Sequence, residues 1–252
     1  MPRPVSDELE LLWSDDDYIA VQKPAGLATI PGRAEVNSVL EQLGEQLKLP
    51  VSGADDPRVR VVHRLDKDTS GVLVFAKHRA AQQHLSHQFR NNLLQKEYMA
   101  LVVGRPIDSS GTVDAPLGPH PKSPKHMTVL KHGGRPARTE WKLGETFRHY
   151  SLLRCFPKTG KTHQIRVHLK HAGLPLAIDP LYNPDGKPIL LSSFKRGYRP
   201  NEREERPLID RLTLHAHRLT FVRMNEESVT VEAELPKDFR AALNMLRKYS
   251  SR

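Results

Sequence analysis

The chain has 252 residues, of which 38% are hydrophobic and 27% are charged, and its formal net charge is +10 at pH 7. These proportions are ordinary for a soluble globular protein, and the length suits a single domain. No run approaches the ~20 apolar residues of a membrane helix, and the lone cysteine, Cys155, excludes an intrachain disulfide and a thiolate metal cage. The N-terminus does not have the pattern of a secretory signal. We therefore expect a cytoplasmic protein, a monomer, without a membrane partner.

The first part of the chain predicts a hairpin followed by a capped helix. Glu10–Trp13 and Tyr18–Lys23 flank the turn-forming residues SDDD, which is typical of two paired strands. Ser38 and Glu41 have the spacing of a capping box and predict a helix over Ser38–Lys48. The other expected strands are Val59–Val62, Val72–Phe75, Lys96–Val103, Arg138–Leu143, Tyr150–Phe156, Leu212–Phe221 and Ser228–Leu235. The other expected helices are Arg79–Asn91, Thr162–His171 and Asp238–Lys248.

Two stretches interrupt this succession of elements. Pro116–Pro124 carries four prolines, and Asn183–Pro207 is rich in proline, glycine and charges of both signs. We interpret the second stretch as a surface insertion, partly disordered, in a single domain over residues 1–252. Strands and helices mix without a strict βαβ alternation. This order favours the α+β class with a mostly antiparallel sheet.

The positive charge is concentrated in one quarter of the chain. Ala115–Ile178 contains 12 Lys or Arg against only two acids, Glu140 and Glu145, whereas the remaining residues carry equal numbers of each sign. Lysine and arginine release counterions from phosphates, so such a distribution is typical of a protein that binds a polyanion. The alternative is a solvated basic face without a partner.

The segment HRLDKDTSG follows one expected strand and precedes another. In an extended segment Arg64 and Asp66 point one way while His63 and Leu65 point the other way. A carboxylate beside a guanidinium stays ionised and can act as a nucleophile or a base. The alternative is a structural aspartate that caps the turn.

Two further segments carry side chains suited to binding a nucleotide. KTHQIRVHL opens a helix, whose N-terminus is a natural anion site, and Arg166 lies one turn inside it, where it can pair with a carboxylate. Tyr98 lies on a strand, where it can stack on a base or serve as an ordinary core aromatic. The thirteen histidines include no HExxH pattern, and GxxxxGK[ST], GxGxxG and GxSxG are absent. Metal, nucleotide-hydrolysis and dinucleotide chemistry therefore have no support.

Together these motifs resemble those of the RluA-type pseudouridine synthases. The resemblance spans about Leu11 to Leu235, and its two most specific motifs are HRLDKDTSGVLVFAK (His63–Lys77) and GKTHQIRVHL (Gly160–Leu169). The supporting motifs, in the family's order, are KPAG (Lys23–Gly26), KEYMALVVG (Lys96–Gly104), RPARTEW (Arg135–Trp141), PLAIDPLY (Pro175–Tyr182) and LHAHRLTF (Leu214–Phe221).

The resemblance implies a pseudouridine synthase fold, a curved mixed sheet flanked by helices with a central cleft. It implies isomerisation of uridine to pseudouridine in ribosomal or transfer RNA, without cofactor or metal. In these terms Asp66 matches the catalytic aspartate and Arg166 its basic partner. Tyr98 matches the tyrosine that packs on the target base, and Ile165 the apolar residue lining the pocket. Arg64 matches the residue that fills the gap left by the flipped nucleotide.

Two departures from the family pattern bear on the substrate. Many members have GDPLYG where this chain has Ile178-Asp-Pro-Leu-Tyr-Asn183, and the lost glycines are expected to alter a turn. We expect no N-terminal RNA-binding domain of the S4 type before the hairpin, and we therefore expect RNA affinity to come from the catalytic domain itself. The sequence leaves open whether Asp66 adds to the pyrimidine, attacks C1′ or removes the C2′ proton. A non-catalytic RNA-binding or ribosome-assembly protein on the same fold is the alternative.

Overall fold

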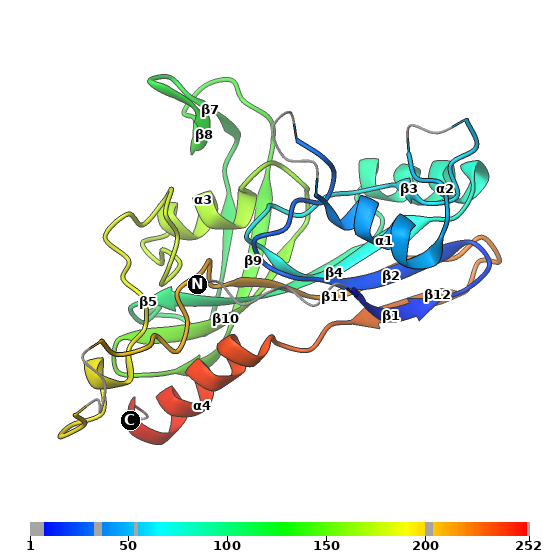
Figure 1. Ribbon diagram of the computed structural model, residues 1–252. Helices are drawn as coiled ribbons and strands as arrows, with labels where there is room; N and C mark the ends of the chain where they lie inside the picture. The colour runs from blue at the N-terminus through cyan, green and yellow to red at the C-terminus, as the bar shows by residue number, and fades with distance from the viewer. Residues whose placement is uncertain (1–7, 33–36, 53–54, 200–203, 251–252) are drawn as a thin grey trace. The chain divides into compact units, whose positions relative to one another are not determined.

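The computed structural model describes residues 8–32, 37–52, 55–199 and 204–250 (Figure 1). The chain divides into two compact units. Unit 1 comprises Met1–Glu97 and Ala216–Glu234, and unit 2 comprises Tyr98–His215 and Leu235–Arg252. Because the divisions fall inside strand β5 and strand β11, each of these strands contributes residues to both units. Their bounds are Gln95–Val103 for β5 and Leu214–Val222 for β11.

Unit 1 is built on antiparallel strands. β1 (Glu10–Ser14) and β2 (Tyr18–Lys23) form the predicted hairpin, and β2 pairs in turn with β4 (Ser70–Ala76). An Asx turn closes the hairpin, because Asp15 Oδ1 accepts hydrogen bonds from the backbone N–H groups of Asp17 and Tyr18 at 2.9 and 2.7 Å. β4 is also a neighbour of β11 in the sheet, β3 (Arg60–Val61) pairs with β4, and β12 (Ser228–Glu232) pairs with β11.

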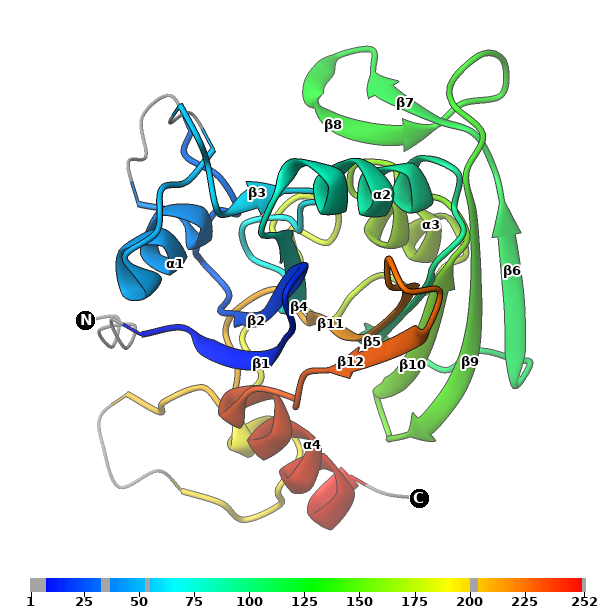
Figure 2. The same ribbon diagram turned by 90° about the vertical axis from the view of Figure 1, so that its right-hand side faces the viewer.

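The helices of unit 1 begin where the sequence predicts. Ser38 caps α1 (Val39–Leu47), and its hydroxyl both accepts from the Glu41 N–H and donates to the Glu41 carboxylate. Helix α2 (Arg79–Arg90) packs against β4 (Figure 2). Apolar side chains of α2, β2 and β4 share one cluster, which includes Tyr18, Ala20, Val72, Val74, Ala81 and Leu85. This packing encloses β4, whose residues are all buried.

Unit 2 contains an antiparallel sheet in the order β5–β10–β9–β6. The bounds of its strands are Ser110–Asp114 for β6, Arg138–Thr146 for β9 and Tyr150–Pro157 for β10. The proline-rich stretch, for which the sequence predicted no element, belongs for the most part to a separate hairpin of β7 (Leu117–His120) and β8 (Ser123–Val129). Proline lacks a backbone donor, and a two-stranded ribbon tolerates it because an edge strand does not need every N–H for pairing.

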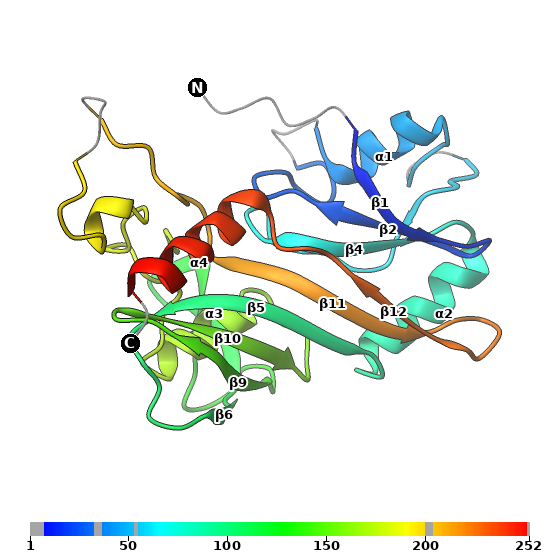
Figure 3. The ribbon, with the colours of Figure 1, turned by 90° about the horizontal axis from the view of Figure 1, so that it is seen from below.

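Helices lie on both faces of the unit 2 sheet. Alternate residues of β5 and β10 face opposite sides, so Ala100 and Leu153 join a cluster with α3 (Gln164–His171), whereas Leu101 and Leu152 join one with α4 (Lys237–Ser250). Figure 3 shows α4 running beside this sheet. The alternation and the antiparallel pairing in both units agree with the predicted α+β class.

A backbone bridge joins the insertion at 183–207 to the chain that follows it in unit 2. Ile189 and Ile209 form a two-way backbone bridge at 2.9 and 2.8 Å through Ile189 N–H and Leu208 N–H, and both isoleucines are 1% exposed. A 3-10 turn, Leu191–Ser193, follows the first isoleucine. Residues 200–203 of the insertion lie outside the described residues. The described part is thus anchored in the core, which is more order than the composition indicates.

Candidate active-site elements

The HRLD segment of unit 1 has the predicted alternation of side chains. Leu65 is 6% exposed and His63 points into the unit, whereas Arg64 is exposed and Asp66 is half-buried. Among the described residues the Arg64 side chain makes no hydrogen bond or ion pair. The segment therefore presents Arg64 and Asp66 on the side away from the core.

His63 fixes the start of this segment against the neighbouring strand. Its Nε2 accepts a hydrogen bond from the Val74 N–H at 3.0 Å, and its ring stacks on Phe89 with centroids 4.4 Å apart. Burial, followed by the nearby Lys96 charge, lowers the pKa of His63 to about 3. The ring is therefore neutral at physiological pH with its proton on Nδ1, as an acceptor at Nε2 requires.

Lys23 holds the turn that follows Asp66. The lysine is 0% exposed, and its Nζ donates to the carbonyl oxygens of Pro24, Lys67 and Thr69 at 2.8, 2.7 and 2.8 Å. A buried ammonium must satisfy its three donors, and two of the three acceptors here lie within the turn. The available signal for this residue was the KPAG motif, which contains Lys23 and supports the family resemblance.

Thr29 clamps the residue before Asp66. Its hydroxyl donates to the Leu65 carbonyl at 3.0 Å and accepts from the Leu65 N–H at 3.2 Å. The Asp66 carbonyl accepts from the Thr69 N–H at 3.1 Å. Nothing in the sequence singles out Thr29, because its contact is 36 residues away along the chain. Together with Lys23 it fixes the backbone on either side of Asp66.

Gly71, in the same motif, is required by a close approach of backbone. Its φ is +122°, and an added Cβ would lie 2.1 Å from the carbonyl oxygen of Ala216 in β11. Any side chain here would force β11 away from β4. The glycine of the DTSG sequence therefore sets the spacing of two strands beside Asp66.

In unit 2, the predicted site residues Tyr98 and Ile165 belong to one apolar cluster. Tyr98 lies opposite Cys155 in the β5–β10 pairing and packs, half-buried, against the cluster that contains Ile165. Ile165 is 6% exposed and comes from the first turn of α3. The structure thus brings an aromatic ring on a strand and an apolar residue on a helix into the same cluster.

Arg166 forms a buried, bidentate ion pair with a carboxylate, as the sequence allowed, but with Asp179, a partner that the sequence did not single out. Its Nε and Nη2 donate to the two carboxylate oxygens of Asp179 at 2.8 and 2.7 Å, and the side chains are 7% and 1% exposed. The Tyr182 ring lies below the guanidinium, 5.0 Å from its carbon to the ring centroid. Asp179 therefore locks the guanidinium in one orientation and leaves Nη1 outside the pair. The predicted pairing of Arg166 with Asp66 stays a prediction.

Asp179 also organises the loop in which it lies. Its Oδ1 accepts from the N–H groups of Leu181 and Tyr182 at 3.0 and 3.1 Å. The residue that replaces the family's second glycine, Asn183, donates through Nδ2 to the Leu176 carbonyl at 2.9 Å. The asparagine therefore closes this turn with its own side chain. The PLAIDPLY motif contains Asp179 and was the available signal for it.

Two buried side chains orient α3 on the neighbouring strand. Gln164 donates to Thr139 Oγ1 at 3.0 Å, and Thr139 Oγ1 lies 2.9 Å from His168 Nδ1. His168 Nε2 lies 3.1 Å from the Ala115 carbonyl, so Nε2 carries the proton and Nδ1 accepts from the threonine. Burial lowers the pKa of His168, which keeps the ring in this neutral form. A Schellman motif closes the helix, with Gly173 at φ +74° as the sequence predicts.

Comparison with known proteins identifies a family whose matched region contains the candidate site residues. The family described as RNA pseudouridylate synthase matches residues 17–171, a range that contains Asp66, Tyr98 and Arg166. The chain belongs to the RNA pseudouridylate synthase family. This confirms the resemblance to RluA-type synthases.

Two curated relatives of this family are 37% identical to the chain. Both are named ribosomal large subunit pseudouridine synthase D, one from Nitrosomonas europaea over 95% of this chain and one from Xanthomonas campestris pv. campestris over 97%. The chain spans 65% and 71% of their respective lengths, about two thirds. A solved structure of human RNA pseudouridylate synthase domain containing 1 is 23% identical, with a TM-score of 0.72 over 100% of both chains. It confirms the predicted pseudouridine synthase fold.

The described residues contain neither a cluster of metal-binding side chains nor a helix that could span a membrane. No three His, Cys, Asp or Glu side chains within them gather where they could hold a metal ion. No helix that they form is long and apolar enough to cross a membrane.

Proposed function

We propose that this chain isomerises uridine to pseudouridine in RNA, with Asp66 as the catalytic carboxylate. The observation that carries the proposal is the restraint on Asp66. Hydrogen bonds from Lys23 and Thr29 to the adjoining backbone fix the segment while its carboxylate stays half-buried rather than in the core. A reacting carboxylate gains from fixed geometry, so this restraint favours a catalytic role for Asp66.

The reaction asks for few groups. The N1–C1′ bond of uridine breaks, the base rotates while held, C5–C1′ forms, and the hydrogen on C5 leaves to water. Asp66 engages the nucleotide as an anion, and Arg166 supports that charge as its basic partner. The guanidinium is already oriented by Asp179, so a carboxylate meets it without reordering.

The remaining predicted residues hold the nucleotide. A stacked uridine cannot reach a reacting carboxylate, so the target is flipped from its stack at a cost of a few kcal/mol. Stacking on Tyr98 offsets ~1–3 kcal/mol of this cost, and Ile165 lines the apolar side of the base. Arg64 is exposed and fills the gap that the flipped nucleotide leaves. No cofactor is needed for these steps.

The substrate we propose is ribosomal RNA of the large subunit. The names of the two relatives favour this RNA over transfer RNA, the other candidate of the sequence. The basic quarter between Ala115 and Ile178 supplies the general affinity for phosphates. A single catalytic domain, a monomer and a cytoplasmic location stay predictions.

Tritium release tests the activity. Large-subunit RNA transcribed with tritium at C5 of uridine should release tritium to water when incubated with the protein, and Asp66→Ala should abolish release. The matched control is Asp68→Ala, which removes an exposed carboxylate two residues away and should keep release near the wild-type rate. Release by Asp66→Ala moves the catalytic group elsewhere. RNA binding without release by the wild type, on large-subunit and transfer RNA alike, favours the non-catalytic alternative.

A further inference from the structure

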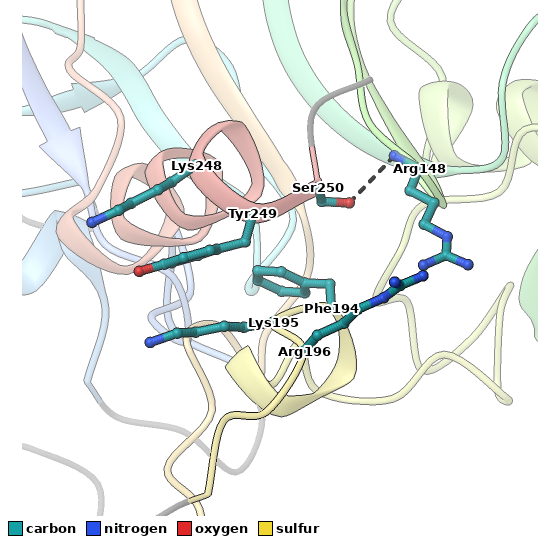
Figure 4. Close-up of a pocket in the computed structure, with 7 residues that line it drawn as sticks. All are labelled: Arg148, Phe194, Lys195, Arg196, Lys248, Tyr249 and Ser250. Atoms are coloured by element: carbon teal, nitrogen blue, oxygen red, sulfur yellow. Dashed lines mark hydrogen bonds between the residues drawn. The ribbon is translucent and has the colours of Figure 1, made fainter.

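A cationic pocket lies in unit 2, apart from the residues assigned to catalysis. It has a volume of about 600 Å³ and is lined by Arg148, Phe194, Lys195, Arg196, Lys248, Tyr249 and Ser250 (Figure 4). Four of these side chains are cationic and none is acidic. Sites for apolar small molecules are lined mainly by hydrophobic side chains, so this lining indicates an anionic ligand instead.

The cations of the pocket have no carboxylate partner among the described residues. No described Asp or Glu oxygen lies within 4.0 Å of the charged nitrogens of Arg148, Lys195, Arg196 or Lys248. Their neighbour Arg247 differs, because its guanidinium donates to both oxygens of Glu145 at 2.7 Å. The structure therefore neutralises one cation at this end of α4 and leaves the pocket positive.

Tyr249 positions two of the ammonium groups. The Nζ atoms of Lys195 and Lys248 lie 4.9 and 5.3 Å from its ring centroid, and Figure 4 shows the ring between the two lysines. Interaction with Lys248, together with the charge of Lys195, lowers the pKa of the Tyr249 hydroxyl. Because both lysines lie against the Tyr249 ring, the ring positions these cations and is not available for stacking on a base.

The two arginines converge in the same pocket. Figure 4 shows the side chains of Arg148 and Arg196 pointing toward one another. The backbone N–H of Arg148 donates to the Ser250 carbonyl at 2.9 Å, which fixes one arginine to the end of α4. Guanidinium groups that approach without a carboxylate repel, and a phosphate that each can bind through paired N–H donors removes the repulsion.

The helix end alone does not explain this arrangement. The C-terminal carbonyl groups of α4 favour basic residues in the last turn, which accounts for Lys248. Lys195 and Arg196 come from the insertion at 183–207, which is joined to the core at Ile189 and Ile209. The insertion thus adds two basic side chains next to a helix end whose last turn already contains the basic residues Arg247 and Lys248.

We propose that this pocket binds the phosphodiester backbone of the substrate RNA, at nucleotides other than the target uridine. This gives the insertion a role in RNA binding, and it rests on the proposed function for the identity of the ligand. We name RNA rather than an acidic protein because the paired donors of arginine match phosphate oxygens. Arg148 also belongs to Ala115–Ile178, whose concentrated positive charge is typical of a nucleic-acid binder.

The test is the salt dependence of RNA binding by the full chain. Wild type, Arg196→Gln, Lys248→Gln and the double variant are compared by filter binding to unmodified large-subunit RNA between 50 and 200 mM salt. Each lost phosphate contact should reduce the slope of log affinity against log salt by about 0.7–0.9. Across this fourfold range, the fall in affinity of the double variant should be smaller than that of wild type by a factor of about 7–12.

The matched control is Arg247→Gln, which removes the same charge from the adjacent helix residue, where Glu145 already pairs with it. Its slope should equal the wild-type slope. Equal slopes for wild type and the double variant, or an equal change in Arg247→Gln, overturn the proposal. Binding to poly-glutamate is measured for the same proteins. If the double variant loses as much affinity for poly-glutamate as for RNA, the pocket is a general polyanion surface, and this result also overturns the proposal.

The outcome is separate from that of the proposed function. If wild type releases tritium but the variants have the wild-type salt slope, the RNA-binding role of the pocket is rejected and the synthase activity stands. If the pocket variants change the salt slope but wild type releases no tritium, the pocket stands as an RNA-binding site and the synthase activity is rejected.

Discussion

Acidification should destabilise this protein through His63, by an amount that follows from its contacts. The native state holds the ring neutral, with a pKa of about 3, because burial and then the nearby Lys96 charge disfavour the imidazolium, and Nε2 already accepts from the Val74 N–H. In the unfolded chain its pKa is about 6.5. Below pH 6.5 the unfolded state binds a proton that the native state refuses, so the free energy of unfolding falls as the pH falls. The stability is fully present above that pH, and its loss approaches about 1.4 kcal/mol per pH unit toward pH 3.

Between pH 7 and pH 5 this contribution amounts to about 2 kcal/mol. The measurement is urea unfolding of wild type and His63→Gln at pH 7, 6 and 5. Glutamine can accept from the Val74 N–H but does not titrate. The difference between the two proteins removes the contributions of His168 and of the carboxylates, which both share. Wild type should lose about 2 kcal/mol more than the variant. Parallel loss in both proteins would refute the reasoning, since His63 would then accept a proton in place.

Substitutions at Lys23, Arg166 and Tyr98 test the candidate site further. Lys23→Met leaves two carbonyl groups of the turn after Asp66 without their donor and should lower the free energy of unfolding by about 2 kcal/mol or more, measured in denaturant, with slower tritium release. Arg166→Met leaves the Asp179 carboxylate buried and unpaired, which should cost about 3–5 kcal/mol of stability. Adding Asp179→Leu should restore stability but not tritium release, and recovery of both would remove the arginine from catalysis. Tyr98→Phe keeps the ring and should weaken turnover less than Tyr98→Ala, whereas the reverse order would assign the role to the hydroxyl.

Local patterns predicted the elements whose signals lie within a few residues. The Ser38–Glu41 capping box places the start of α1, and the apolar spacing over Asp238–Lys248 places α4. Glycine at 173 marks the end of α3 because only the left-handed conformation fits there. Each of these signals concerns a single turn of chain, so no distant contact is needed to interpret it.

The elements that sequence reasoning missed depend on distant partners. The β7–β8 ribbon pairs Pro119 with Met127, and its prolines hide the alternation that normally marks a strand. In the insertion, Ile189 meets Ile209 across a charged loop, and composition alone gives no sign of that bridge. Tertiary pairing overrides local composition in both cases.

The same distinction holds for the candidate site. The motifs named Asp66, Tyr98 and Arg166, because reactive side chains stand out by type and position. They did not name Asp179 as the carboxylate that orients Arg166, since a separation of 13 positions along the chain leaves many partners open. Thr29 was missed for a similar reason, because its hydroxyl serves a backbone group whose location the sequence does not reveal.

The polar network under α3 has a consequence for motion. The buried side chains of Gln164 and His168 both bond to Thr139, so the helix cannot rotate about its axis or slide by one residue without breaking both contacts at once. Amide exchange in α3 should therefore be slow and should occur through one cooperative opening rather than by fraying. A ligand that binds at Arg166 therefore contacts a preorganised helix. The conformational entropy of α3 is lost on folding, so binding does not have to order the helix again.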